Sequence, residues 1–145
     1  DPRIEAYFHE HRLDFERARI RHIVMREEEE ARELLLALED GEEFFTLALM
    51  HSVDEDTRYA GGYLGWVGRR SLSGQEEAAV FGAKAGETVG PFPYAMGWRI
   101  IMVEERKAPA LNDRTRAEIR EALFREWLKN EWMHAEIELP LLQLL

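Results

Sequence analysis

The apolar and polar positions of the chain alternate in some segments, as in strands, and follow the helical period in others. Residues 19–25 alternate and are rich in β-branched side chains, which predicts a strand. One face of that strand carries Ile20, His22 and Val24, and the other carries Arg21, Ile23 and Met25. His22 is therefore a polar residue on an otherwise apolar face.

The remaining periodic segments predict further helices and strands. Helical spacing marks residues 2–16, 27–40, 42–51, 75–81 and about 113–136, the last with Asn112 as its cap. Short apolar runs predict strands at 64–67, 88–92 and 98–103. The resulting order of strands and helices indicates an α+β fold, an antiparallel sheet with surrounding helices.

Apolar stripes also lie at both ends of the chain. The first helix carries Ile4, Tyr7, Phe8 and Phe15; the last carries Phe124, Trp127, Leu128 and Trp132, and an apolar end follows at Leu141–Leu145. Leaving so many large apolar side chains in water is costly. We therefore expect the two helices to pack on each other, on a missing segment or on a second copy, as a small helical lobe. The expected domains are 1–18 and 107–145 for the lobe and 19–106 for the α+β domain.

Composition narrows the classes of function. The 145 residues contain 19 Lys and Arg against 29 Asp and Glu, and the net charge of −10 disfavours nucleic acid and anionic membranes as partners. No cysteine is present, which excludes disulfides and cysteine-based metal sites or nucleophiles. No apolar run reaches the roughly 20 residues of a membrane span. The chain begins at Asp1 rather than Met, so we expect a fragment or a processed form; the compartment, cytosol or an oxidising space, stays undecided.

Motifs for phosphate binding, dinucleotide binding, zinc proteolysis and serine hydrolysis are absent from the sequence. His9 and His11 would point to different faces of their helix, and Glu27–Glu30 suits a helix start better than a calcium loop. We expect no metal and no cofactor.

Five short segments in order carry a resemblance to a known family. They are Arg21–Met25, Phe44 to Asp54, Gly61–Trp66, Glu77 to Pro91 and Gly97–Val103. Together they resemble the parvulin family of peptidyl-prolyl cis–trans isomerases. The flanking helices, with Leu-Phe-x-x-Trp-Leu at 123–128, are similar to those of bacterial SurA-like chaperone–isomerases.

The resemblance implies a site of two histidines on central strands, a Cys or Asp beside them, and a pocket of Leu, Met and Phe. The implied catalytic positions hold His22, Asp54 and Arg99, and the implied substrate-binding positions hold Leu64, Leu72, Glu76 and Met96. Neither a metal nor a cofactor belongs to this site.

Two of these residues depart from the family pattern. Glu76 stands where a pocket Phe is expected, so its carboxylate would turn to solvent or pair with a nearby Arg. Arg99 stands where the second His is expected; it would favour a neutral His22, which Asp54 would oppose, or it would pair with Asp54 itself. A purely structural role is the alternative for three of the site residues. His22 would be a buried core histidine, Asp54 a turn cap and Arg99 a tie between strands.

Rotation about a peptide bond faces a barrier of about 18–20 kcal/mol but breaks no bond, so a domain without a nucleophile or metal suits the reaction. The resemblance implies an isomerase, with impaired activity, acting on Xaa-Pro bonds of proline-containing polypeptide clients. Glu27–Glu30 would repel a phosphorylated substrate. The alternative is a non-catalytic polypeptide-binding chaperone or adaptor module.

Overall fold

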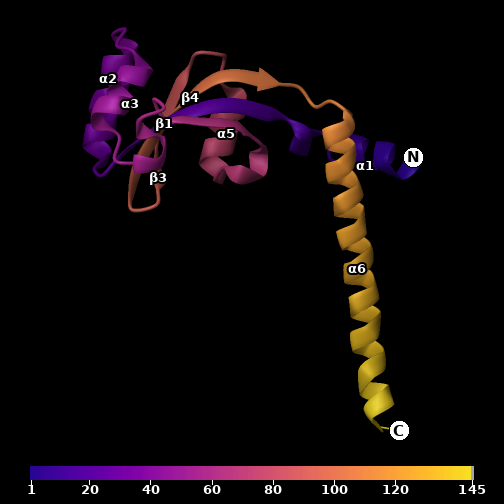
Figure 1. Cartoon of the computed structure of the whole chain (residues 1–145). Helices are drawn as coiled ribbons and strands as arrows, with labels where there is room; N and C mark the ends of the chain where they lie inside the picture. Colours follow the sequence, from indigo (N-terminus) through magenta and orange to yellow (C-terminus); the bar gives the residue numbers. More distant parts are fainter. Residues whose placement is uncertain (145) are drawn as a thin grey trace. The chain divides into compact units, whose positions relative to one another are not determined.

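The computed structural model describes the backbone of residues 1–144 and the side chains of residues 1–135. The helices are α1 (Pro2–Glu10), α2 (Glu28–Glu39), α3 (Phe44–His51), α4 (Glu55–Arg58), α5 (Gly74–Gly82) and α6 (Asp113–Leu144) (Figure 1). The strands are β1 (Arg17–Met25), β2 (Tyr63–Val67), β3 (Thr88–Tyr94) and β4 (Gly97–Lys107), and short 3-10 helices are η1 (Arg12–Phe15) and η2 (Arg69–Ser71). The chain divides into two compact units, one of residues 13–109 and one of residues 1–12 with the residues from Ala110 onward.

The larger unit is built on a 4-stranded sheet in the order β2-β1-β4-β3. Each of the three pairings is antiparallel, and β1 and β4 are the central strands. The predicted α+β class is therefore confirmed, and so is the predicted strand at 19–25, which the structure extends to Arg17–Met25.

Each face of the sheet buries its own apolar core. One core joins Ala18, Ile20, Ile101 and Val103 to Val80 and Phe81 of α5. The other joins Ile23, Met25 and Ile100 to Ala31 and Leu34 of α2 and to Phe44, Leu47 and Ala48 of α3. Burying a large apolar side chain stabilises a fold by about 1.5–3 kcal/mol, so this unit carries a substantial core of its own.

The first turn of α5 is fixed by its cap. The Ser73 hydroxyl accepts from the backbone N–H of Glu76 at 3.3 Å, and the Glu76 carboxylate accepts from the backbone N–H of Ser73 at 3.0 Å. This capping box holds the Glu76 side chain at the start of the helix.

The predicted helix over 2–16 is wrong in its second half. The helix ends at Glu10, and a 3-10 turn over Arg12–Phe15 follows. At His11 the backbone N–H and the ring Nδ1 both contact the carbonyl of Tyr7, and the two rings stack with centroids 4.0 Å apart. These contacts satisfy the Tyr7 carbonyl in the last turn, and the backbone leaves the helical region at His11, where φ is −113° and ψ is 28°.

In the smaller unit α1 contacts α6. Ile4 and Phe8 of α1 and Ile119 of α6 are buried, and Asn112 caps α6 by accepting from the N–H of Thr115 at 2.9 Å. The predicted end of this helix at about 136 is too early, because α6 runs to Leu144. No helix among the described residues is long and apolar enough to cross a membrane.

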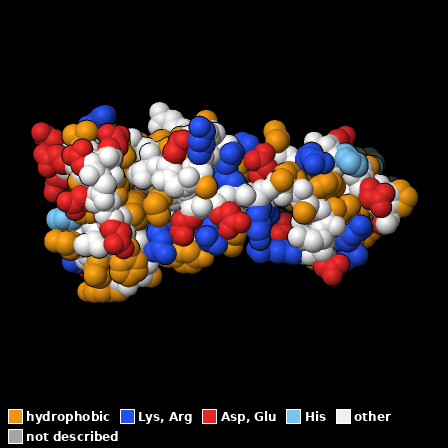
Figure 2. Space-filling model, turned by 90° about the horizontal axis from the view of Figure 1, so that it is seen from above, with side chains coloured by type: hydrophobic (Ala, Val, Ile, Leu, Met, Phe, Trp, Pro, Cys, Tyr) orange, Lys and Arg blue, Asp and Glu red, His pale blue; other side chains and the backbone are white. Residues whose placement is uncertain are grey.

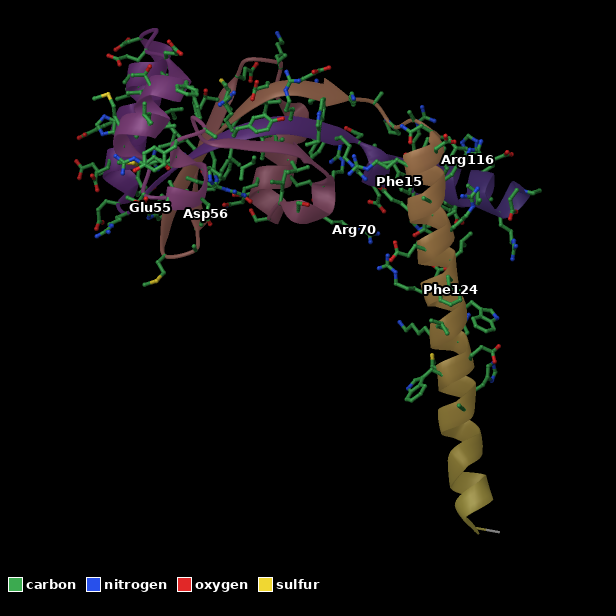
Figure 3. All side chains as sticks on the ribbon, viewed as in Figure 1. Phe15, Glu55, Asp56, Arg70, Arg116 and Phe124 are labelled. Carbon is green, nitrogen blue, oxygen red and sulfur yellow. The ribbon has the colours of Figure 1, made fainter. Side chains whose placement is uncertain are left out.

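The apolar stripe of α6 is not covered by α1. Phe124, Trp127, Leu128 and Trp132 are 57%, 56%, 45% and 68% exposed, and Phe124 projects from the helix in Figure 3. The buried residues of α6 among those described are Thr115 and Ile119, near its start. The expected contact between the two helices is confirmed, but α1 covers only the start of α6; the side chains of Leu141–Leu145 lie outside the described residues.

Candidate active site

His22 lies at the centre of β1 and is fully buried. Its backbone N–H donates to the carbonyl of Gly62 at 2.9 Å, which ties the loop before β2 to the strand. Gly62 has a φ of +83°, and a Cβ there would lie 2.1 Å from the His22 carbonyl oxygen. Only glycine allows this close approach, so the Gly-Gly turn serves to hold His22 in place.

Asp54 lies beside His22, in the segment that precedes α4. Nε2 of His22 is 2.7 Å from Oδ2 of Asp54, and the hydroxyl of Thr57 donates to the same oxygen at 2.6 Å. The segment is attached to β1, because the Ser52 hydroxyl accepts from the N–H of Val24 at 3.2 Å. Burial by itself would raise the pKa of Asp54, but the hydrogen bonds from Thr57 and His22 outweigh it and lower the pKa.

Arg99 of β4 lies on the other side of His22. Its Nη1 is 3.1 Å from Nδ1 of His22, and its Nε donates to Oε2 of Glu76 at 2.6 Å. The guanidinium also lies over the ring of Tyr94, 4.1 Å from its centroid. Arg99 and Glu76 are 5% and 3% exposed, so the two form a buried ion pair.

The structure decides between the alternatives for these charged residues. Glu76 pairs with Arg99 and does not turn to solvent. The bidentate Arg99–Asp54 pair does not form, because Asp54 faces Nε2 of His22 while Arg99 faces Nδ1. Burial would raise the pKa of Glu76, but the hydrogen bond and charge of Arg99 together with the hydrogen bonds from Ser73 outweigh it and lower the pKa.

Opposing influences act on His22. Burial is the largest and lowers its pKa, and the positive charge of Arg99 lowers it further. The hydrogen bond and charge of Asp54 act in the opposite direction without overcoming them. His22 is therefore held neutral more firmly than an ordinary histidine.

A groove of about 770 Å³ opens beside Asp54. Its walls come from the end of β1, the segment before α4 and the turn between β3 and β4; the lining residues are Val24, Met25, Arg26, Glu27, Val53, Asp54, Tyr94, Ala95, Met96 and Gly97. Met96 is fully exposed at the tip of that turn, next to Ala95 with its positive φ of 49°.

Of the predicted site residues, Asp54 and Met96 line this groove. His22, Asp54, Glu76 and Arg99 form one connected cluster, and Met96 lines the groove. Leu64 is partly exposed on β2, whereas Leu72 packs against the core beneath α5.

Sequence reasoning missed Thr57 and Tyr94. Thr57 orients Asp54 from the short helix α4, and its position three residues after Asp54 was the available signal. Tyr94 contacts both Arg99 and His22, with its ring edge-on to the His22 ring at a centroid distance of 5.4 Å. An aromatic residue at the end of a strand, four residues before Trp98, gave no sign of that role.

A family model and several known proteins are similar to this chain. A family model described as "Rotamase: PPIC-type PPIASE domain" matches residues 22–105. The foldase protein PrsA of Halalkalibacterium halodurans is 35% identical over 107 residues, covering 74% of this chain and 32% of the relative. The chaperone SurA of Nitrosococcus oceani is 32% identical over 127 residues, covering 78% of this chain and 30% of the relative.

The fold is also similar to that of solved structures. The crystal structure of the peptidylprolyl isomerase PrsA from Bacillus cereus has a TM-score of 0.69 at 23% identity, covering 93% of this chain and 54% of that one. The chain spans about a third of the length of the curated relatives named above.

Proposed function

The chain belongs to the PPIC-type parvulin family of peptidyl-prolyl cis–trans isomerases, and we propose that it isomerises Xaa-Pro bonds in non-phosphorylated polypeptides. The observation that carries the proposal is the buried His22–Asp54 pair, 2.7 Å apart, with Asp54 opening onto the groove. Uncatalysed exchange at such bonds takes tens to hundreds of seconds. The catalyst has to favour the twisted amide, and a groove with apolar walls and a few fixed polar groups provides that environment.

The activity is impaired relative to the family pattern. Glu76 replaces the apolar residue against which a proline ring packs, and its ion pair with Arg99 places two charges next to His22. A proline ring gains little from contact with a buried ion pair, because its favourable transfer depends on apolar surface. We therefore expect slower turnover and weaker binding of the ring than in an apolar pocket.

A phosphate before the proline would be repelled. Glu27 lines the groove, and Glu28, Glu29 and Glu30 follow it in the first turn of α2. Figure 2 shows acidic side chains crowded over the part of the molecule that carries this helix. Arg26 is the one cation among the groove residues, and it lies next to this acidic run.

The second candidate is a non-catalytic module that holds extended polypeptides in the same groove. The buried Glu76–Arg99 pair favours it, since the family resemblance implies that a proline-binding side chain stands at position 76. In either case the polypeptide-binding domain is the sheet unit, expected over 19–106 and spanning residues 13–109 in the structure, and α1 with α6 forms the helical lobe.

An exchange measurement on short peptides tests the proposal. Exchange between cis and trans forms of Ala-Pro, Ser-Pro and phosphoserine-Pro peptides is followed by NMR with and without the protein. Acceleration for the first two and none for the third supports the proposal. Binding of the peptides without acceleration of any of them supports the non-catalytic module instead.

A further inference from the structure

One continuous line of polar contacts crosses the larger unit. It runs from Asp54 at the groove through His22 and Arg99 to Glu76, with steps of 2.7, 3.1 and 2.6 Å. Its far end is fixed at the backbone of Ser73, whose N–H donates to Glu76. The residues come from β1, β4, α5 and the segment before α4, so the line joins elements on both sides of the site.

The chemistry of arginine sets the direction of every hydrogen bond in this line. A guanidinium carries donors and no acceptor. Nδ1 of His22 can therefore contact Arg99 only as an acceptor, with its lone pair free. The ring proton of a neutral His22 must then lie on Nε2, where it donates to Asp54.

A second proton on His22 would disrupt this arrangement. It would replace the hydrogen bond from Arg99 with two N–H groups facing each other, and it would add a positive charge beside a permanent one. The groups that face the ring are Asp54 before α4, Arg99 of β4, Glu76 of α5 and Tyr94 of β3. Of these, only the two carboxylates favour protonation, and each is already hydrogen-bonded.

We propose that Arg99 and Glu76 are positioning residues that lock His22 as the neutral Nε2–H tautomer. Arg99 supplies the donor to Nδ1, while Glu76 aims the guanidinium and balances its charge in the buried site. A histidine at position 99 could reverse its donor and acceptor roles and take up a proton; an arginine cannot. Asp54 thus receives the same hydrogen bond from His22 over a broad pH range.

The direct test is a nitrogen-15 NMR titration of His22 in the intact protein, without any substrate. The expected spectrum has one bare ring nitrogen at Nδ1 and one protonated nitrogen at Nε2, with a titration midpoint below the ordinary histidine value of about 6.5. A proton on Nδ1, a mixture of tautomers, or a midpoint at or above the ordinary value would overturn the proposal.

A variant without the ion pair supplies the comparison. Glu76→Leu with Arg99→Met removes both charges and leaves no unpaired partner in the core. The titration midpoint of His22 should then rise and both tautomers should appear, because Arg99 affects the pKa of His22 more than Glu76 does.

Arg69→Gln is the matched control, since Arg69 pairs with Glu16 and Glu77 away from His22, and it should leave the His22 spectrum unchanged. An unchanged His22 spectrum in the double variant would overturn the proposal.

The tautomer proposal rests on the proposed isomerase activity only where the tautomer is taken to affect the rate of peptide exchange. The tautomer proposal and the isomerase proposal can therefore be refuted separately. A locked tautomer without peptide exchange would count against the isomerase alone. Should the double variant fail to fold, the titration of the unmodified protein still decides the question.

Discussion

Nη1 of Arg99 lies 3.1 Å from Nδ1 of His22, so a permanent cation occupies the place where the family resemblance calls for a second histidine. The same guanidinium is paired with the buried carboxylate of Glu76 at 2.6 Å. Two departures from the family pattern are thus one feature, since each charge compensates the other. The His22–Asp54 side of the site keeps the residues that the resemblance implies.

Removing either residue of the His22–Asp54 pair should slow peptide exchange. We expect His22→Ala and Asp54→Asn each to reduce the catalysed rate at least about tenfold, which corresponds to about 1.4 kcal/mol of barrier. Both changes remove the fixed polar contact beside the groove. The measurement is NMR exchange on an Ala-Pro peptide.

The control for that pair is Asp56→Asn. Asp56 is an exposed acid on α4, two residues beyond Asp54 (Figure 3), and the variant changes its side chain but keeps its backbone hydrogen bond to Asp54. Its variant should keep the parent rate. Equal rates in the parent, His22→Ala and Asp54→Asn would contradict the catalytic assignment.

Restoring the apolar pocket should raise the activity. Glu76→Phe with Arg99→His replaces the ion pair by the Phe and His of the family pattern. We expect faster peptide exchange than in the parent, by about tenfold, because the proline ring regains apolar contact of about 1–2 kcal/mol. A double variant that folds normally and gains nothing would show that Glu76 does not occupy the pocket position.

The sequence predicted the strands well because their signals are local. Alternation in β1 places Ile20 in one core and Ile23 in the other, and it marks His22 as buried. Helix ends were harder, as at Glu10: the apolar spacing continues to Phe15, but the backbone leaves the helical region at His11.

The candidate site was predictable only in part. The family resemblance supplied His22 and Asp54, but the partner of Glu76 depended on which way α5 presents its first turn. Two outcomes, solvent or an arginine, fitted the sequence equally, and the capping box with Ser73 decides between them in three dimensions. The role of Tyr94 depends on the close approach of β3 and β4, which no local pattern encodes.

Breaking the buried ion pair at one end should destabilise the fold. Glu76→Ala leaves Arg99 charged and unpaired in the interior, and we expect the free energy of unfolding to fall by about 3–5 kcal/mol. Glu77→Ala is the matched control on the same helix, because Glu77 forms a partly exposed ion pair with Arg69 and should cost about 1 kcal/mol or less. Urea unfolding of both variants measures the difference, and equal losses would contradict the account of a buried pair.

Stability should decline in two stages as the pH falls. His22 has a lowered pKa in the folded state, so the unfolded chain binds its proton first and stability starts to fall below about pH 6.5. Glu76 and Asp54 also have lowered pKa values, and their contributions are complete above the ordinary carboxyl values of about 4 and lost below them. The second stage should therefore be steeper. Urea midpoints over this range measure it, and in His22→Gln the first stage should disappear; its persistence would exclude His22 as the cause.

The helical lobe should be separable from the isomerase domain. The sheet unit has a core on each face of its sheet, and those cores are built entirely from residues between Ala18 and Val103. Deleting residues 112–145 should therefore leave the 19–106 domain folded, with the His22 environment and its peptide exchange unchanged. The same deletion removes Ile119 and uncovers Ile4 and Phe8, so α1 should lose its helical structure.

Ile119→Asp is the milder variant, and it should disturb α1 while leaving the rate of peptide exchange by the full chain intact. Amide hydrogen exchange resolves the two units, because protection should vanish in α1 and persist in β1 and β4. Loss of protection throughout the sheet in the truncated chain would show that the domain depends on the lobe, and the proposed division of the chain would then be wrong.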